Sequence, residues 1–412
     1  MSTPTDCDIA VVGAGMVGAT LACALAVDGW RVTLVESSEL AWPPPEFDPD
    51  AGPDLRVSAI SVASERIFRN LGMWDLLEGW RISPYWRMEV WEGGARIGFD
   101  SAELPWPHLG HIIENRLIRD AALHCLHRAG GERVRTVTGT GVSDMRSDGA
   151  QAARLRLEDG REVSARLVVA ADGAGSPLRG IAGLRAWQRW YDQQAVVAVV
   201  ACEHAHQATA RQRFLRGGPL ALLPLADGRC SIVWSTAAEH ADELVAMAPE
   251  AFSDAVSEAS EHVLGRLELD GERRSFPLRF LQAGRYRAPR LALVGDAAHV
   301  VHPLAGQGVN LGLLDAAALA GVLGTAGASR TDPGSARLLG RYERWRKGHN
   351  LLVGGVMHGF KHLFGNASPV LILARDSGLS LVDRSGPVKR AIMRQAMGLE
   401  GDLPPLARIA PA

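Results

Sequence analysis

The sequence predicts an α/β protein with a Rossmann-like nucleotide-binding domain and a second domain built on an antiparallel sheet. The first domain is indicated by an N-terminal β-α-β pattern, in which two β-branched runs flank a helical stretch. The second is indicated by apolar runs between residues 187 and 236 that no helical segment separates. The length of 412 residues exceeds what one hydrophobic core usually supports, so two domains are expected.

Composition and charge exclude several classes of protein. The formal net charge is −2, and no cluster of basic residues marks a surface for nucleic acid or an anionic membrane. The five scattered cysteines lack the spacing of a zinc site or a disulfide framework, which fits a reducing compartment. The stretch from Ile9 to Val27 is uncharged, but three glycines interrupt it, so we expect no transmembrane segment and a cytoplasmic protein.

A glycine-rich turn in the β-α-β unit predicts a dinucleotide site. The turn has the sequence Gly13-Ala14-Gly15-Met16-Val17-Gly18. Such glycines let the backbone approach a pyrophosphate at the N-terminus of a helix, here expected over Met16 to Asp28. Glu36, after a second strand over Trp30 to Val35, would bind ribose hydroxyls and disfavours a 2′-phosphate. The site would therefore take FAD or NAD rather than NADP.

A second segment, Gly295 to Asp315, predicts a loop that faces a ligand. A buried strand, Arg290 to Val294, ends there, and Asp296 is placed to accept a hydrogen bond from a sugar or ribityl hydroxyl. Backbone N–H groups of Gly306 to Asn310, at the start of a helix, would point at the negative charge that reduced flavin carries. The alternative is an ordinary strand-to-helix turn with a capping aspartate.

A third strand and turn, Leu167 to Arg179, is by itself equally consistent with a common Asp-Gly turn. Together, the three segments resemble the class A flavoprotein aromatic hydroxylases over essentially the whole chain. The sequence from His302 to Asp315 is similar to the signature of the ubiquinone-biosynthesis hydroxylases. Arg56 to Ser61, Leu109 to Asn115 and Arg394 to Leu399 look most like the bacterial 2-polyprenylphenol hydroxylase branch of that family.

The resemblance implies a set of cofactor-binding residues. The glycine turn and Glu36 would hold the ADP half of FAD, and Arg56 and Arg116 would lie along the flavin and the pyrophosphate. Asp172 would belong to the motif shared between FAD and the reducing nicotinamide, and Asp296 would bind the ribityl chain. The residues expected to border the isoalloxazine ring are Pro303, Gly306, Gln307, Gly308, Val309 and Asn310.

The activity that the resemblance implies is hydroxylation of a phenol ring. NAD(P)H would reduce FAD, O2 would add at the flavin C4a carbon to give a hydroperoxide, and its distal oxygen would pass to a polyprenylphenol intermediate of ubiquinone biosynthesis. NAD(P)H would dock transiently, because no second dinucleotide fold is evident. No side chain is identified as catalytic. The alternatives are hydroxylation of a later ring position, a flavin-dependent reductase or dehydrogenase, and a non-enzymatic FAD-binding scaffold.

The expected layout is an FAD-binding domain over 1–185 with inserted strands at about 80–110, a substrate domain over 186–284, a return to the FAD-binding domain over 285–365, and a C-terminal helical segment over 366–412. In the substrate domain, Ala241 to Leu267 is expected to be helical. Phe214, Leu222 and Trp234 are the residues expected to face the substrate. No metal site is expected, because His299, His302 and Asp296 offer too few ligands.

The expected partners are a prenylated phenol and O2, with no nucleic acid. Because such a substrate resides in membranes, we expect the enzyme to meet it by peripheral contact with the inner membrane, through a carrier, or in a complex with other ubiquinone-biosynthesis proteins. A homo-oligomer is a separate expectation. Ser377 to Leu399 mixes basic and apolar residues, so it is either a docking helix or an ordinary surface helix.

Overall fold

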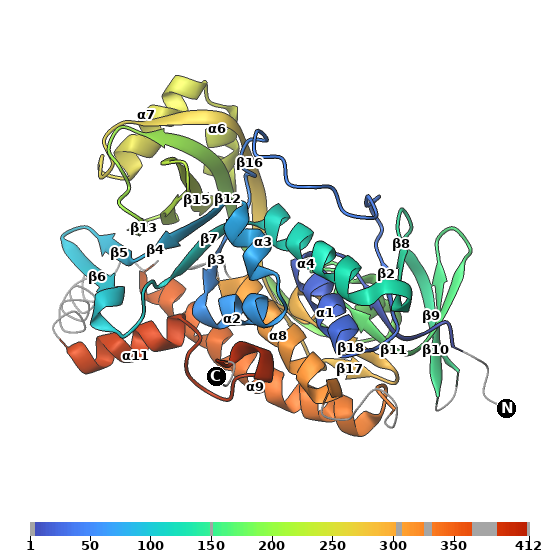
Figure 1. Cartoon of the computed structure of the whole chain (residues 1–412). Helices are drawn as coiled ribbons and strands as arrows, with labels where there is room; N and C mark the ends of the chain where they lie inside the picture. The colour runs from blue at the N-terminus through green and yellow to red at the C-terminus, as the bar shows by residue number, and fades with distance from the viewer. Residues whose placement is uncertain (1–4, 149–150, 302–306, 325–331, 365–384, 410–412) are drawn as a thin grey trace.

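The computed structural model describes residues 5–148, 151–301, 307–324, 332–364 and 385–409 (Figure 1). In these residues, a first sheet runs in the order β17, β18, β11, β1, β2, β8, and the hairpin β9–β10 pairs with β11. The strands are β1 (Cys7–Val12), β2 (Val32–Val35), β8 (Val134–Val137), β9 (Val142–Asp148), β10 (Ala152–Leu157), β11 (Glu162–Ala170), β17 (Arg287–Ala288) and β18 (Leu291–Leu293). Its central strands β18, β11, β1, β2 and β8 are parallel, which confirms the Rossmann-like prediction.

Helices from three parts of the chain pack on one another around α1 (Met16–Val27). It contacts α4 (Asn115–Gly130) and α8 (Gln307–Gly324), and α8 in turn contacts α9 (Ala336–Phe364) and α2 (Val62–Asn70). Every residue of α1 from Gly18 to Ala26 is buried, which explains why its sequence is apolar on all sides. The short helices α3 (Trp74–Gly79) and α5 (Pro177–Ile181) complete this part.

The second large sheet has the order β19, β16, β12, β15, β14, β13, β5, β6 among the described residues. Its strands are β5 (Arg87–Glu92), β6 (Ala95–Asp100), β12 (Ala186–Cys202), β13 (Thr209–Leu215), β14 (Gly218–Pro224), β15 (Cys230–Ala237), β16 (Leu267–Ala283) and β19 (His299–Val300). Strands β12 to β16 pair antiparallel wherever they are neighbours, as predicted. Gly228, in the turn of the β14–β15 hairpin, has a φ of +91°, a conformation that glycine adopts without strain.

One face of this sheet is covered by α6 (Ala238–Ala246) and α7 (Pro249–Ala259), at one end of the molecule (Figure 1). The prediction for Leu222 and Trp234 was wrong, because both pack in the apolar cluster that contains Leu244 and Phe252 of these helices. The helical prediction over 241–267 was correct only in part. Pro249 starts a second helix, and the chain then enters β16, which the charged sequence of that strand did not indicate.

A third sheet has three strands, and β5 and β6 of the second large sheet lie between two of them in the sequence. Its central strand β7 (Gly110–Glu114) pairs antiparallel with β3 (Val57–Ser61) and with β4 (Ile82–Tyr85). Ile112 of β7 belongs to a buried apolar cluster with Val199 of β12 and with Leu225, so this sheet faces the second large sheet.

The C-terminal part of the described chain contains α11 (Gly386–Ala396), which buries Lys389 and Met393. No helix among the described residues is both long and apolar enough to cross a membrane. The division of the chain into domains at residues 186 and 284 stays a prediction.

Candidate functional site

The predicted motifs follow four neighbouring parallel strands of the first sheet. The glycine turn follows β1, Glu36 follows β2, Asp172 follows β11, and Gly295 follows β18. The strands lie side by side in the order β18, β11, β1, β2. Because parallel strands end at the same edge of a sheet, the four loops meet there, at the position where open α/β sheets bind ligands.

The glycine turn has a backbone and a packing that only glycine permits. Gly13 has a φ of +103°, and a Cβ there would lie 2.3 Å from the carbonyl oxygen of Ala171. A Cβ on Gly18 would lie 1.9 Å from the carbonyl oxygen of Gly13. Gly15, by contrast, is exposed and has no atom within 4 Å of its Cβ position. The turn is therefore closely packed at Gly13 and Gly18 and open at Gly15. A pyrophosphate would approach the N-terminus of α1 on the open side.

The carboxylate of Glu36 adjoins the turn. Its Oε2 accepts a hydrogen bond of 2.6 Å from the Ala14 N–H, and its Oε1 accepts one of 2.9 Å from the Ser38 N–H. Burial acts to raise the pKa of Glu36, but these hydrogen bonds outweigh it and lower the pKa. Glu36 is thus ionised and positioned beside the turn, as an acceptor for ribose hydroxyls requires.

Asp296 follows β18 in a short 3-10 turn, Gly295–Ala297, with Gly295 at a φ of +57°. Its side chain is accessible to solvent although protein atoms crowd it on most sides, and this crowding raises the pKa of the carboxyl group. The positive charges of His299, Arg56 and Arg279 oppose that effect, so these groups lie near the carboxylate. An accessible carboxylate in crowded surroundings suits an acceptor for the hydroxyls of a bound ligand.

Asp172 offers a second unused acceptor. Its Oδ2 accepts a hydrogen bond of 3.1 Å from the Leu178 N–H, while its Oδ1 is buried and has no hydrogen-bond partner among the described residues. Burial raises the pKa of Asp172 against the hydrogen bonds from Ser176 and Leu178. A buried acceptor without a donor is costly, so a ligand hydroxyl or N–H would stabilise this loop.

Arg179 joins the loops after β11 and β18. Its Nη1 donates to the Ala297 carbonyl oxygen at 2.8 Å, and its Nη2 donates to that of Ala174 at 2.9 Å. The planar guanidinium therefore fixes the loop of Asp172 against the loop of Asp296.

We expect Arg179→Lys to weaken the dissociation constant for FAD about tenfold, or ~1.4 kcal/mol, because one ammonium group cannot span both carbonyls. Titration of FAD-free protein, followed by flavin fluorescence, measures this change. Arg87→Lys, which alters an exposed ion pair with Asp100, is the matched control and should leave the affinity unchanged. Equal affinities for Arg179→Lys and the wild type would contradict the role given to Arg179.

The remaining predicted residues are distributed as follows. Pro303 and Gly306 lie outside the described residues, and Gln307, Gly308 and Val309 open α8. The buried side chain of Asn310 holds β3 in place: it accepts from the Ser61 N–H at 2.9 Å and donates to the Ala59 carbonyl oxygen at 2.8 Å. The amide of Asn310 thus couples α8 to β3, so any contact with the isoalloxazine ring is expected from its backbone.

The two predicted arginines occupy different surroundings. Arg56 is exposed and its guanidinium lies 5.2 Å from the centre of the Phe276 ring, in addition to its proximity to Asp296. Arg116 lies in the first turn of α4, with Nη2 at 3.8 Å from Oε2 of Glu114. The assignment of both to FAD stays a prediction, as does the rest of the set of site residues.

Asp315 on α8 is a buried carboxylate that supports the loop after β18. The sequence did not indicate this role. Its Oδ1 accepts from Arg346 at 2.7 Å, and its Oδ2 accepts from His299 at 2.6 Å and from the Gly295 N–H at 3.2 Å. His299 is therefore a structural histidine within the core. Asp315 anchors the backbone that carries Asp296.

Glu65, His108 and His111 form a group that the sequence analysis did not identify, with ligand-type atoms within 4.8 Å of one another. The oxygens of Glu65 already interact with Arg69 at 2.8 Å and with His108 at 2.6 Å. We therefore assign the group to the contact between α2 and β7, and the expectation of no metal stays untested.

Burial lowers the pKa of His111 from 6.5, so the folded state favours the neutral ring. The stability that this ring contributes is present above pH 6.5 and is lost as the pH falls through the folded pKa, because the unfolded chain then binds the extra proton. We expect the unfolding free energy, measured with urea, to fall between pH 7 and pH 5. The unfolding free energy of His111→Gln should fall less over the same pH range. An equal fall for the variant and the wild type would contradict this assignment.

Comparison with known proteins agrees with this geometry. Residues 6–352 match the family model described as an FAD binding domain. Ubiquinone hydroxylase UbiL of Rhodospirillum rubrum is 39% identical over 95% of this chain and 89% of its own length. The 3-demethoxyubiquinol 3-hydroxylase of Escherichia coli is 39% identical over 96% of this chain and 99% of its own length. The mitochondrial ubiquinone biosynthesis monooxygenase COQ6 of Homo sapiens is 35% identical over 95% of this chain and 92% of its own length.

Solved structures share the fold. One from Pseudomonas aeruginosa, pqsL, described as a probable FAD-dependent monooxygenase, has a TM-score of 0.73 and 25% identity, covering 90% of this chain and 99% of its own. The p-nitrophenol 4-monooxygenase PnpA of Pseudomonas putida has a TM-score of 0.75 at 19% identity, covering 95% of this chain and 98% of its own, which shows the fold alone.

The fold and the four loops define a flavoprotein of the class A aromatic hydroxylases, with FAD as the dinucleotide and NAD(P)H as its reductant. Within that class, the chain belongs to the family of the ubiquinone-biosynthesis hydroxylases, and it is an FAD-dependent aromatic-ring monooxygenase. The choice of FAD over NAD, left open by the glycine turn alone, is thereby confirmed.

Proposed function

We propose that this enzyme hydroxylates the aromatic ring of a polyprenylphenol intermediate of ubiquinone biosynthesis, with NAD(P)H and O2 as co-substrates. The observation that carries the proposal is the similarity, along nearly the whole chain, to relatives named as ubiquinone hydroxylases. The apolar side chains that meet between the three-stranded sheet and the second large sheet also support it. Leu55, Val57 and Leu223 remain only partly buried there, as expected for walls that contact an apolar ligand.

FAD, when bound, supplies the redox and oxygen chemistry, and the chain's residues bind it, orient it and exclude water. The N–H groups of residues 13–18 would bind the pyrophosphate, and Asp296 would accept from the ribityl hydroxyls. The N-terminal end of α8 would favour negative charge on a bound flavin. The apolar side chains between the two sheets would exclude the water that otherwise diverts the oxidation to hydrogen peroxide.

The test is an assay of purified, FAD-loaded protein with a prenylated phenol, NAD(P)H and 18O-labelled O2. We expect the phenol to stimulate NAD(P)H oxidation and one labelled oxygen atom to appear in the product. Oxidation that needs no O2 and gives no hydroxylated product would identify a reductase or dehydrogenase instead. Bound flavin without any substrate-stimulated oxidation would identify a scaffold.

A second candidate is hydroxylation at a later ring position, which the similarity to 3-demethoxyubiquinol 3-hydroxylase favours. Identifying the quinone precursor that accumulates in cells without this protein separates the two. A precursor that lacks the first ring hydroxyl supports the polyprenylphenol step. A precursor that already carries it assigns the protein to the later step.

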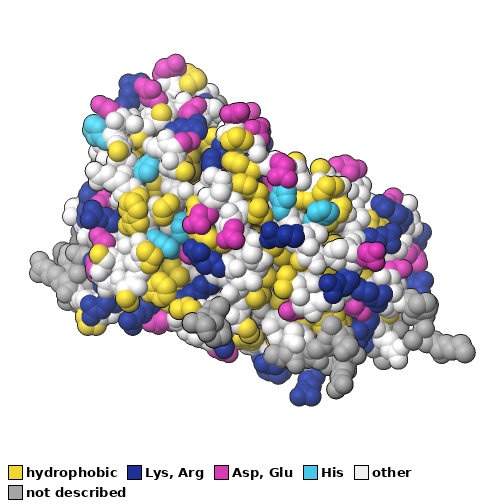
Figure 2. Space-filling model, in the orientation of Figure 1, with side chains coloured by type: hydrophobic (Ala, Val, Ile, Leu, Met, Phe, Trp, Pro, Cys, Tyr) yellow, Lys and Arg dark blue, Asp and Glu magenta, His cyan; other side chains and the backbone are white. Residues whose placement is uncertain are grey.

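A bilayer or a protein complex must deliver such a substrate, and α11 supports contact with a bilayer. This helix exposes Val388 and Ile392 beside Arg390 and Arg394, while Met393 faces the core. On the face shown in Figure 2, basic and acidic side chains are mixed, and this face has no broad basic area of the kind that binds nucleic acid. Membrane contact, a biosynthetic complex and a homo-oligomer remain parts of this proposal.

A further inference from the structure

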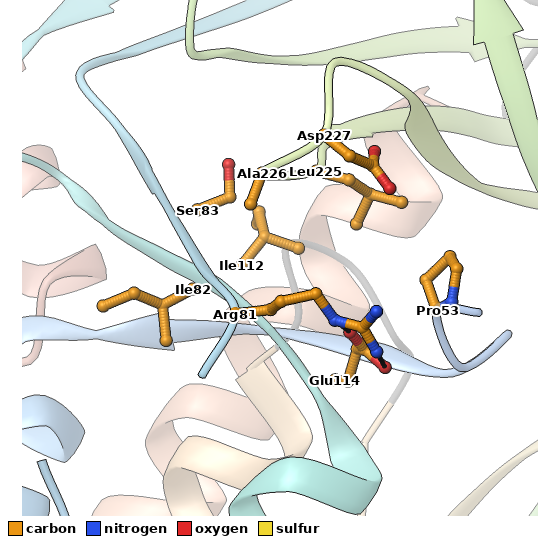
Figure 3. Close-up of a pocket in the computed structure, with 9 residues that line it drawn as sticks. All are labelled: Pro53, Arg81, Ile82, Ser83, Ile112, Glu114, Leu225, Ala226 and Asp227. Atoms are coloured by element: carbon orange, nitrogen blue, oxygen red, sulfur yellow. Dashed lines mark hydrogen bonds and ion pairs between the residues drawn. The ribbon is translucent and has the colours of Figure 1, made fainter. Parts of the chain in front are cut away.

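A slot opens between the tip of the β14–β15 hairpin and the three-stranded sheet (Figure 3). One wall is formed by Ile82 of β4 and Ile112 of β7, and the opposite wall by Leu225 and Ala226 of the hairpin tip. It contains about 290 Å³ of space that no atom fills, part of which is open solvent. The slot therefore has two apolar walls and opens to the surface, and Arg81, Ser83, Glu114 and Asp227 also line it.

The slot adjoins the apolar cluster that is packed between the two sheets. Ile112 and Leu225, which line the slot, also belong to the cluster that contains Val199 and contacts Val57 and Ala59 of β3. Leu55, Leu223 and the ring of Tyr85 also pack against this cluster. A hydrocarbon chain entering the slot would thus remain in apolar surroundings.

Strand β3 connects the slot to the flavin loops. Val57 of β3 is paired with Glu114 at the slot, and Ser61, at the far end of β3, is paired with Gly110. The Ser61 N–H donates to Asn310 at the start of α8, where the isoalloxazine ring is expected. Four steps along a strand span ~13 Å, so the slot lies only a short distance from the expected position of the flavin.

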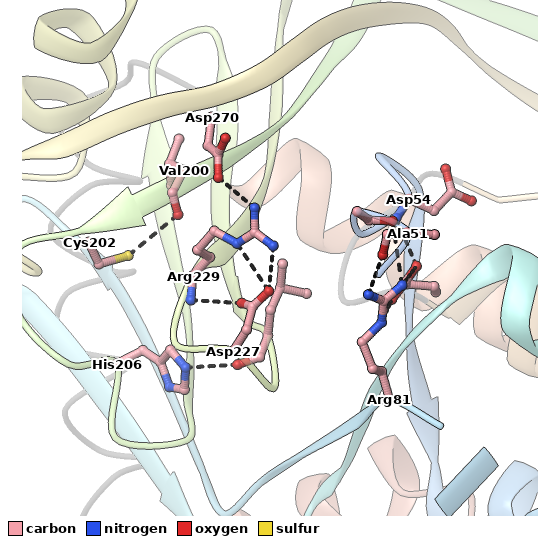
Figure 4. A network of polar contacts seen from close by, with 12 residues as sticks. Ala51, Asp54, Arg81, Val200, Cys202, His206, Asp227, Arg229 and Asp270 are labelled. Carbon is pink, nitrogen blue, oxygen red and sulfur yellow. Dashed lines mark hydrogen bonds and ion pairs between the residues drawn. The ribbon is translucent and has the colours of Figure 1, made fainter. Parts of the chain in front are cut away.

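The charged groups that line the slot or lie beside it are paired with one another. Arg81 lies 3.1 Å from Glu114, and Arg229 lies 2.5 Å from Asp227 and 2.5 Å from Asp270 (Figure 4). His206 interacts with the Leu225 carbonyl oxygen at 3.0 Å and fixes the hairpin tip. A hydrocarbon can therefore pass this rim without leaving a charge unpaired.

We propose that this slot is the passage for the isoprenoid tail of the substrate, which runs from the ring-binding space between the two sheets and leaves the protein past Ala226. The proposal rests on the function proposed above and specifies where that substrate's tail binds. Ile112 and Leu225 are only 2% and 6% exposed, so they fill the passage when no tail is present and must move apart to admit one. These two side chains and Ala226 then determine how bulky a tail the enzyme accepts.

The test enlarges Ala226, an exposed residue whose replacement leaves the core intact. We expect the series Ala226→Ser, Ala226→Leu and Ala226→Trp to lower kcat/KM for a prenylated phenol progressively, by about tenfold or more for Trp. The kcat/KM for the same phenol without its tail should stay at the wild-type value. Val27→Trp, on the exposed end of α1, is the matched control and should change neither value.

The outcomes separate this inference from the proposed function. If wild-type protein hydroxylates both phenols but the Ala226 series affects them equally, or affects neither, the slot does not hold the tail and the inference is overturned. If wild-type protein hydroxylates neither phenol, the proposed function has failed and the inference fails with it. FAD content and urea unfolding show whether each variant is correctly folded. If Ala226→Trp misfolds, Ala226→Ser and Ala226→Leu provide the comparison between the two phenols.

Discussion

A Gly13→Ala variant is expected to be purified without FAD and without activity. The φ of +103° is unfavourable for alanine, and the new Cβ would lie 2.3 Å from the Ala171 carbonyl oxygen and 2.6 Å from the carbonyl carbon. Both are backbone atoms, so the turn must move away from the end of β11. A strained residue costs roughly 1–3 kcal/mol, and the displaced N–H groups can no longer bind the pyrophosphate. Flavin absorbance per protein measures the loss.

Gly15→Ala is the matched control for this prediction. Its Cβ position has no atom within 4 Å, and its φ of −68° suits any residue. FAD-free Gly15→Ala should therefore unfold at the wild-type urea concentration, while its affinity for FAD falls because the methyl group occupies the approach of the pyrophosphate. FAD-free Gly13→Ala should be less stable. Retention of FAD by Gly13→Ala at the wild-type level would show that the turn does not bind the dinucleotide.

Asp315→Asn is expected to lower the free energy of unfolding by about 3–5 kcal/mol, because it leaves the guanidinium of Arg346 buried without its counter-charge. The side chains of Asp315 and Arg346 are 0% and 2% exposed, so water cannot replace the lost partner. The amide also cannot accept on both sides as the carboxylate does. Urea unfolding of the FAD-free protein is the measurement, and FAD retention should fall as the Gly295 backbone loosens.

The pH dependence of this variant provides an internal check. Burial acts to raise the pKa of Asp315, but the positive charges of His299 and Arg346 outweigh it, and the pKa lies below 3.8. The stability from the ionised carboxylate is present above that unfolded-state value and is lost as the pH falls through the folded pKa. The difference between wild type and Asp315→Asn should therefore shrink in acid.

Asp270→Asn is the matched control for Asp315→Asn. Its ion pair with Arg229 is exposed, with 49% of the Asp270 side chain accessible, so the change should cost less than about 1 kcal/mol. If Asp315→Asn were no more destabilising than Asp270→Asn, Asp315 would not anchor the loop of Asp296.

The sequence by itself determined the features that depend on local backbone geometry. The glycine turn and the β-α-β unit around it need particular residues at particular φ angles, so the residues reveal them without knowledge of their neighbours. The resemblance of the three loop segments then identified FAD and the hydroxylase family.

Only the tertiary structure decided the features that depend on which elements meet. Leu222 and Trp234 face α6 and α7 rather than the substrate because those helices cover that face of the sheet. The alternation of side chains along a strand is the same whichever face the helices cover, so the sequence does not show which face is turned to the substrate. The central role of Asp315 arises because α8, α9 and the loop after β18 converge on one buried carboxylate. The slot beside Ala226 likewise exists because residues more than a hundred positions apart face each other across two sheets, a relation that no local pattern in the chain records.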